Sequence, residues 1–277
     1  MSTLGANERR AYLSNVVRSN GEALAAAVER CSDLGIGAFR VSSQIMPLAT
    51  HPVSGYDLGD LDDGDAIVET YRRAGAIARE RNVRLSFHPD QFVVLNSESE
   101  RVVEASLHEM RHQGAMAELI GAEALTLHVG GRAGGVQEAL ARFESAIARL
   151  AEPARSLIAL ENDDRLFSPA FLLPFCERLG IPFIYDVHHH RCNPDDISVS
   201  EATQRAIGTW RGREPWMHIS SPKDGWIATN PRMHAGFIDP SDIPDEWSSI
   251  RMTVDVEAKE KERAVLAIMN TVATPKD

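Results

Sequence analysis

The residues best suited to chemistry lie in one stretch, from Phe183 to Pro194, whose sequence is FIYDVHHHRCNP. It begins as an apolar run of strand type and continues into a carboxylate and three imidazoles: Asp186, His188, His189 and His190. A buried strand that stops on such residues presents metal ligands at its C-terminal edge, and these donors suit Mn, Fe or Zn. Asp186 and His189 reach one ion only if the chain turns between them, and Pro194 supports a turn. The alternative is a surface loop that is rich in histidine.

The same pattern recurs along the chain, which favours a metal site over a chance cluster of histidines. Six short β-type runs end in or contain a ligand-type residue, in the order His88, His128, Glu161, Asp186, His218 and Glu257. Polar or glycine-containing sequence and then a helical pattern follow each run. One ligand-type residue at the end of each successive strand is how a (β/α) barrel builds its active site.

The predicted elements alternate between strand and helix. Seven strands are expected. Six are at residues 38–43, 84–87, 124–128, 157–161, 216–220 and 252–257, and the remaining one begins at Phe183. Helices are expected at residues 7–31 (interrupted at Asn20-Gly21), 66–81, 100–121, 136–150, 168–179, 200–210 and 258–273. Connections of this length allow parallel crossovers, so we predict an α/β fold, a TIM-type (β/α) barrel. The first strand is either a cryptic one at residues 2–6 or missing.

Composition is that of an ordinary globular protein, with 43% hydrophobic and 25% charged residues among 277. α/β barrels of this length form one domain, so we expect residues 1–277 to be a single domain. The three cysteines are widely spaced, which indicates a reducing compartment, here the cytoplasm. No apolar run is long enough to span a bilayer, and no secretory signal opens the sequence, so we expect no membrane partner. The net charge of -11 argues against broad nucleic-acid binding, although divalent ions would offset part of it locally.

The number of ligand-type groups predicts more than one ion. Six of the ten histidines fall at predicted strand ends or in the loops beyond them: His51, His88, His128, His189, His218 and His234. Three carboxylates join them: Glu161, Asp186 and Glu257. Nine groups supply enough donors for two or three ions, whereas a structural zinc needs four. Ions about 3.5–4 Å apart are typical of phosphoryl-transfer hydrolysis. The long loop at residues 220–244, which carries Lys223 and His234, is also typical of function.

The ordered series of motifs resembles the UV damage endonuclease family. The matching segments are FRVSS at residues 39–43 with His51-Pro52, LSFHPDQF at 85–92, LH at 127–128, LEND at 160–163, DVHH at 186–189, MHISS at 217–221 and DVEAK at 255–259. The resemblance extends from about Leu34 to Val265. Any one motif would also fit endonuclease IV and xylose isomerase barrels, so it is the ordered series that is specific.

The resemblance implies a metal-dependent endonuclease that nicks double-stranded DNA immediately 5′ to cyclobutane pyrimidine dimers and 6-4 photoproducts. It implies that one ion is held by Glu161, Asp186, His218 and Glu257. Glu161 would bridge to a second ion held with His88 and His128, and Asp186 to a third held with His189 and His234. Catalytic roles are expected for Glu161, His51 and His218. The expected cofactor is two or three Mn²⁺ ions, with Zn²⁺ or Mg²⁺ as alternatives.

The predicted DNA contacts are Gln91, Phe92 and Lys223. Gln91 and Phe92 directly follow His88, so they lie on the loop beside the metal site. A photodimer is poorly stacked, so turning it out of the duplex costs less than for normal DNA, and an exposed Phe92 could fill the gap. The alternative is that Phe92 begins a buried apolar run with residues 93–95. We expect a monomer that acts on damaged DNA at the nucleoid.

Two features depart from the family pattern, and two other functions stay open. Family members commonly open with a strand that carries an aromatic residue near the lesion, which this sequence does not show, and some have a modified lysine where Trp216 stands here. The first alternative is a sugar isomerase or epimerase on the same barrel, which a count of bound metals would distinguish. The second is a non-catalytic damage-binding protein, which nicking of irradiated plasmid would exclude.

Overall fold

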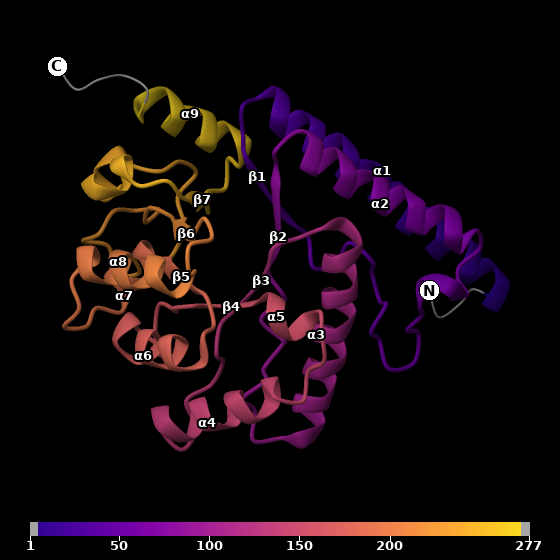
Figure 1. Cartoon of the computed structure of the whole chain (residues 1–277), viewed down its shortest axis with the longest axis horizontal. Coiled ribbons are helices and arrows are strands. Elements are labelled where there is room, and N and C mark those ends of the chain that lie inside the picture. The colour runs from indigo at the N-terminus through magenta and orange to yellow at the C-terminus, as the bar shows by residue number, and fades with distance from the viewer. Residues whose placement is uncertain (1–4, 273–277) are drawn as a thin grey trace. The chain divides into compact units, whose positions relative to one another are not determined.

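The computed structural model describes residues 5–272, and Figure 1 shows their helices and strands. The seven strands are β1 (Ala38–Val41), β2 (Arg84–Phe87), β3 (Ala124–Leu127), β4 (Ile158–Glu161), β5 (Phe183–Asp186), β6 (Trp216–Ile219) and β7 (Thr253–Val256). The α-helices are α1 (Ala6–Asp33), α2 (Gly64–Glu80), α3 (Glu100–Ile120), α4 (Val136–Ile147), α5 (Ala154–Leu157), α6 (Pro169–Leu179), α7 (Val187–Cys192), α8 (Val199–Thr209) and α9 (Glu262–Val272). The 3-10 helices are η1 (Leu58–Asp60), η2 (Pro240–Asp242) and η3 (Asp245–Ser249).

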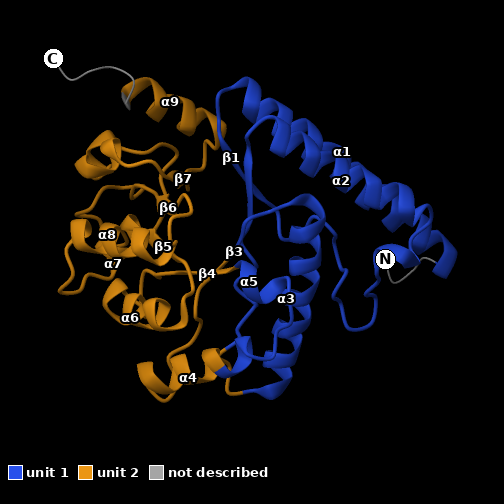
Figure 2. Cartoon of the chain, in the orientation of Figure 1, with its two compact units in different colours: residues 1–95, 99–125, 145–157 blue, residues 96–98, 126–144, 158–277 orange. Residues whose placement is uncertain are grey.

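The chain divides into two compact units, which Figure 2 colours separately. Unit 1 holds residues up to 95, 99–125 and 145–157, and unit 2 holds residues 96–98, 126–144 and those from 158 onward. The expectation that residues 1–277 form one domain stays a prediction.

Strand pairing is parallel and follows chain order. In unit 1, β1 pairs with β2, and β2 pairs with the first half of β3. Strand β3 continues into unit 2, where β4, β5, β6 and β7 follow in order. Strands β3 to β6 are buried along their whole length, as expected where helices cover a parallel sheet. The alternation predicted from the sequence is confirmed, and the fold is a TIM-type (β/α) barrel. Most of the suggested cryptic strand at residues 2–6 lies outside the described residues, and Ala6 begins α1.

Helix α1 in unit 1 runs unbroken through Asn20-Gly21, so the predicted interruption there is wrong. The reason is close packing against α2. A Cβ at Gly21 would lie 3.0 Å from Thr70 Cγ2 and 3.2 Å from the Tyr71 ring. The Tyr71 hydroxyl donates a hydrogen bond to the Val17 carbonyl oxygen at 2.9 Å, which joins the two helices at this point. The glycine therefore permits an approach between helices, at the usual penalty of about 1 kcal/mol for glycine within a helix.

The larger differences from the prediction concern three further helices. Helix α7 forms directly after β5, where only a turn was expected, and Asp186 caps it by accepting a hydrogen bond from the His189 backbone N–H at 2.7 Å. The four-residue helix α5 was not predicted. Helix α9 begins at Glu262 rather than Ala258, because Lys261 closes a turn on Ala258 and has a φ of 50°.

Helix α8 fixes the beginning of β5 in unit 2. Thr209 Oγ1 accepts a hydrogen bond from the Phe183 backbone N–H at 2.8 Å, and Trp210 Nε1 donates one to the Phe183 carbonyl oxygen at 2.9 Å. Helices α6 and α8 both pack on β5 (Figure 1). These buried contacts hold β5 in one register, so the position of Asp186 at its other end is also determined. None of the helices in the described part of the chain is long and apolar enough to cross a membrane.

Candidate metal centre

Parallel register brings ligand-type residues of unit 2 together at successive strand ends. Asp186 at the end of β5 pairs with His218 of β6, and His218 pairs with Asp255 of β7. Because side chains alternate along a strand, Glu257, two residues beyond Asp255, falls on the same side as Asp255. Glu161 is the last residue of β4, the neighbour of β5. The strand ends therefore bring three carboxylates and an imidazole together, namely those of Glu161, Asp186, Glu257 and His218.

The distances in this cluster fit ligands around a divalent ion. His218 Nδ1 lies 3.1 Å from Glu161 Oε1 and 3.2 Å from Glu257 Oε1. One ligand atom from each of Glu161, Asp186, His218 and Glu257 lies within 4.8 Å of the others. Ligand atoms about 2.1 Å from one ion are about 3.0–3.4 Å from each other, so small adjustments would enclose an ion.

Burial makes a cation at this cluster energetically favourable. Glu161, Asp186 and His218 are all buried. The Oδ2 atom of Asp186 is buried and accepts no hydrogen bond from the described residues. Burying carboxylates costs several kcal/mol each unless they are compensated. A divalent ion would compensate these carboxylates, and the donor set of carboxylates and imidazole suits such an ion.

The protonation states favour metal binding by Glu161. Burial by itself would raise the pKa of Glu161, but the imidazoles of His218 and His128, with a hydrogen bond from His189, lower that pKa well below its usual range. Burial also opposes the charged form of His189, yet the carboxylates of Asp186 and Glu161 raise the pKa of His189 well above its usual value. The lowered pKa favours the ionised form of Glu161, which is the form of a carboxylate that binds a metal ion.

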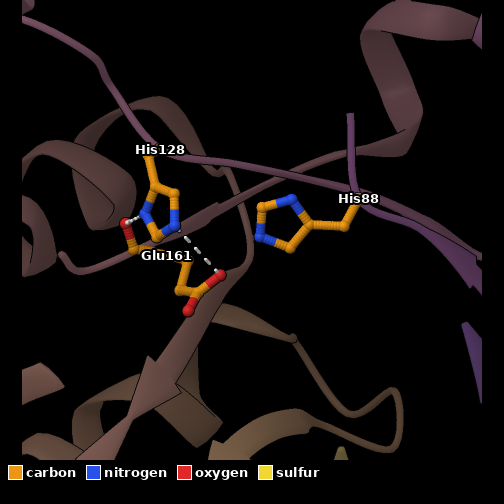
Figure 3. Close-up of side chains that lie close together, drawn as sticks. All are labelled: His88, His128 and Glu161. Atoms are coloured by element: carbon orange, nitrogen blue, oxygen red, sulfur yellow. Dashed lines mark hydrogen bonds and ion pairs between the residues drawn. The ribbon is translucent and has the colours of Figure 1, made fainter. Parts of the chain in front are cut away.

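His128 faces Glu161 with the geometry of a ligand histidine. Its Nδ1 lies 3.4 Å from the Glu161 carbonyl oxygen, and its Nε2 lies 3.7 Å from Glu161 Oε2, as the dashed lines in Figure 3 show. A proton on Nδ1 donated to the carbonyl directs the Nε2 lone pair toward the carboxylate, which is the usual orientation of metal-binding histidines. Figure 3 also draws His88, which belongs to unit 1 and whose Nδ1 lies 3.1 Å from the Pro89 carbonyl oxygen.

His189 and His234 lie in the same part of unit 2. His189 Nδ1 donates a hydrogen bond to the Asn162 carbonyl oxygen at 3.0 Å and lies 3.6 Å from Asp186 Oδ2. His234 Nδ1 lies 3.7 Å from Glu257 Oε2. The centroids of the two imidazole rings are 6.1 Å apart. The structure therefore brings His128, Asp186, His189, His218, His234 and Glu257 around Glu161 within one unit.

Two residues of the site were given no role from the sequence. Asn162 is buried, and its side chain donates a hydrogen bond to the Asp186 carbonyl oxygen at 2.8 Å and accepts one from the Asp186 N–H at 2.9 Å. This pair of hydrogen bonds ties the end of β4 to the end of β5. Asp255 Oδ2 lies 3.5 Å from His218 Nε2, opposite the side of the ring that faces Glu161. The signal for Asp255 was its period-two spacing from Glu257.

Of the predicted residues of unit 1, His88 is half-buried, whereas His51, Gln91 and Phe92 are exposed. His51 Nδ1 accepts hydrogen bonds from the backbone N–H groups of Val53 at 3.2 Å and Ser54 at 3.1 Å, which places its proton on Nε2. Phe92 is 77% exposed and Gln91 is also exposed, whereas the neighbouring Val93 is buried. Phe92 therefore does not begin the buried apolar run. Lys223, in unit 2, is exposed as well.

Comparison with known proteins gives a consistent result. The model of the family described as "UV-endonuclease UvdE" matches residues 1–276. The UV DNA damage endonuclease of Bacillus velezensis is 31% identical over 281 residues, which cover 98% of this chain and 85% of that relative. The crystal structure of SacUVDE superimposes with a TM-score of 0.87 and 28% identity over 98% of this chain and 90% of that one. The crystal structure of endonuclease IV from Thermus thermophilus superimposes with a TM-score of 0.64 and 18% identity. The match covers 90% of this chain and 93% of the endonuclease IV chain, and it shows a shared fold.

Proposed function

The chain belongs to the UV-endonuclease UvdE family and is a DNA repair endonuclease, and from that premise we propose that it nicks duplex DNA immediately 5′ to UV photoproducts. The substrates would be cyclobutane pyrimidine dimers and 6-4 photoproducts. The observation that supports metal-dependent cleavage is the buried cluster of Glu161, Asp186, His218 and Glu257. Buried carboxylates are costly unless a cation compensates them.

The proposed cofactor is two or three Mn²⁺ ions, because Mn²⁺ accepts both carboxylate oxygen and imidazole nitrogen, and Zn²⁺ or Mg²⁺ are the alternatives. The first ion would be held by Glu161, Asp186, His218 and Glu257. Glu161 would share a second ion with His128, whose Nε2 lies 3.7 Å from its Oε2, and with His88 at the end of β2. Asp186 would share a third with His189 and His234.

Divalent ions held there would activate water and stabilise the oxygen that leaves the phosphate. The protein itself would contribute by holding the ligand side chains in fixed positions. Asn162 and the register of β4 to β7 fix the carboxylates before substrate arrives, so little reorganisation is needed at the moment of reaction. His51, with its proton on Nε2, is suited to donate a hydrogen bond to a phosphate oxygen. His218 would act by holding the ion between Glu161 and Glu257.

The proposed contacts with DNA are Gln91 and Phe92 at the lesion and Lys223 at the backbone. The Phe92 side chain is 77% exposed to solvent. Stacking of its ring on an unpaired base would stabilise the complex with damaged DNA by about 1–3 kcal/mol. Membership of the family sets aside the sugar isomerase alternative. Trp216, which is buried where some family members have a modified lysine, keeps the damage-binding alternative open to the nicking test. We also propose that the protein acts as a monomer on DNA of the nucleoid, in the cytoplasm.

A duplex with a single thymine dimer, labelled at the 5′ end of the damaged strand, tests the proposal directly. After loading with Mn²⁺, the protein should cut once, at the phosphodiester bond immediately 5′ to the dimer. The product should be extended by a DNA polymerase, because a 3′-hydroxyl remains. Cutting on the 3′ side of the dimer, or equal cutting of the same duplex without the dimer, would contradict the proposal.

A further inference from the structure

Residues 222–234 of unit 2 form a loop that is closed at its base. The Lys223 backbone N–H donates a hydrogen bond to the Met233 carbonyl oxygen at 2.6 Å, and Pro222 and His234 form an antiparallel bridge. At the tip, the Gly225 N–H donates to the Pro222 carbonyl oxygen, and Gly225 adopts a φ of 81°, a conformation suited to glycine. These contacts give the 222–234 loop a defined conformation. Its last residue is the proposed ligand His234, and its first residue, Pro222, forms a bridge with His234.

Trp226 anchors the tip of this loop to the rest of unit 2. Its Nε1 donates a hydrogen bond to Asp242 Oδ1 at 2.7 Å, and its ring centroid lies 5.1 Å from that of His188. The guanidinium carbon of Arg191 lies 5.7 Å from the same ring. Asp242 is held in turn, because its Oδ2 accepts a hydrogen bond from Ser221 Oγ at 2.5 Å. The indole is therefore fixed on three sides, and the residue that follows it has a fixed position too.

That following residue, Ile227, is 102% exposed, so it makes no appreciable contact with its own chain. An isoleucine in this position gives up the burial that stabilises most isoleucines. Single exposed apolar residues are common on protein surfaces. Ile227 differs because it stands at the tip of an anchored loop whose base contains His234 and whose anchor packs on His188, the residue before the proposed ligand His189.

The charges of the loop suit a DNA partner. Lys223 and Asp224 offset each other, and Arg232 forms an ion pair with Asp164 at 3.2 Å. Although the chain carries a net charge of -11, the tip around Ile227 carries no net negative charge that would repel phosphate. Proteins that distort duplexes insert apolar side chains, isoleucine among them, between base steps.

We infer that Ile227 is an apolar wedge that enters the base stack of duplex DNA bound at the metal centre of unit 2. The inference rests on the proposed function only in taking duplex DNA as the substrate. It adds a contact from unit 2 to those proposed for Gln91 and Phe92 of unit 1. Entry of the isoleucine unstacks one base step and bends the duplex, which brings the backbone toward the ligand cluster.

The test uses duplexes that contain one thymine dimer and a fluorescent 2-aminopurine, placed at successive positions around the lesion. The Mn²⁺-loaded full chain is compared as wild type, Ile227→Ala and Met269→Ala. Met269 is the matched control, because it is also an exposed apolar residue of unit 2, on α9. Unstacking raises 2-aminopurine fluorescence, and affinity is measured in the same titration.

Wild type and Met269→Ala should raise the fluorescence at one further step besides the dimer itself. Ile227→Ala should abolish that rise and weaken binding by about 5- to 30-fold, the effect of losing the burial of most of one isoleucine side chain. Its melting temperature and metal content should not change, because Ile227 contacts nothing within the protein. Affinity and fluorescence equal to those of Met269→Ala would overturn the inference.

Nicking is followed separately on the same duplexes. Wild-type nicking at the dimer together with an unaltered Ile227→Ala variant would reject the wedge and leave the proposed function standing. Absence of nicking by the wild type would instead reject the proposed function, and the fluorescence at the additional step would still report on the wedge.

Discussion

Replacing Glu161 by glutamine removes one negative charge from the metal centre and keeps the shape of the side chain. Glu161 Oε1 lies 3.1 Å from His218 Nδ1 and 3.2 Å from His189 Nδ1. Glu161 Oε2 lies 3.7 Å from His128 Nε2. The two oxygens thus face different imidazoles, as expected of a carboxylate that bridges two ions. An amide offers one oxygen, so the glutamine can serve at most one of the two positions.

The size of the effect follows from linkage between metal binding and folding. An ion present at 100 times its Kd raises the free energy of unfolding by about 2.7 kcal/mol. For a chain of this size that corresponds to a rise in Tm of about 5–10 °C. Glu161→Gln should show less than half of the wild-type rise on addition of Mn²⁺. Its nicking rate should fall by about 1,000-fold or more, which is about 4 kcal/mol in the activation barrier.

The assay combines three measurements on apo and Mn²⁺-loaded protein: elemental analysis, thermal melting and nicking of irradiated plasmid. Glu144→Gln is the matched control, because Glu144 is a carboxylate of unit 2 that forms an ion pair with Arg178 at 2.6 Å, with both side chains well exposed. The control should bind metal, melt and nick as the wild type does. If Glu161→Gln keeps more than about a tenth of the wild-type rate, a loss of only about 1.4 kcal/mol, or binds as many ions as the control, the bridging role is wrong.

Three further outcomes are expected. Changing Gln91 and Phe92 together to alanine should weaken binding to dimer-containing duplex by about 10- to 100-fold, or about 1.4–2.8 kcal/mol, measured by fluorescence anisotropy. A large fall in Tm, as on loss of a core phenylalanine, would refute that account. Asn162→Ala should lower Mn²⁺ affinity by about 10- to 100-fold by calorimetry, because Asn162 holds the backbone of a ligand, and unchanged affinity would exclude this role. Burial raises the pKa of Asp195, but hydrogen bonds from backbone N–H groups, first that of Ala170, outweigh it and lower the pKa. The ionised carboxylate therefore stabilises the fold above the ordinary pKa of aspartate, and this contribution is lost as pH falls through the lowered pKa. The stability difference between wild type and Asp195→Ala, about 0.5–2 kcal/mol at pH 7, should shrink below about pH 4. If urea titrations show the same stability difference between wild type and Asp195→Ala at every pH from 7 to 3, the stabilising role of the ionised Asp195 is wrong.

The strands and the ligand-type residues at their ends could be predicted because buried strands appear in the sequence as short apolar runs. The run at residues 84–87 matches β2 in both bounds, the run at 124–128 extends one residue beyond β3, and the run that begins at Phe183 starts where β5 starts. Each is a short apolar run because a strand of a covered parallel sheet is buried on both faces. Each is followed at once by a polar residue or ends on one, since the C-terminal edge of the sheet is where the chain meets the site.

Other features depend on tertiary contacts that no local pattern records. Asn20-Gly21 is a common break in a helix, yet here the glycine permits the approach of Tyr71. Helix α7 has too few residues for an apolar period and depends on its cap, Asp186. The role of Asn162 arises from two hydrogen bonds to a residue 24 positions later, which its own neighbourhood does not predict.

The central claim is that buried carboxylates and histidines hold divalent ions that cut DNA at ultraviolet damage. The most direct measurement is nicking of supercoiled plasmid, irradiated and unirradiated, by protein first stripped of metal and then given Mn²⁺ or buffer alone. We predict relaxed circles only from irradiated plasmid and only after Mn²⁺ is added. Equal nicking of unirradiated plasmid, nicking that persists in a chelator, or no nicking of irradiated plasmid with Mn²⁺ would contradict the claim.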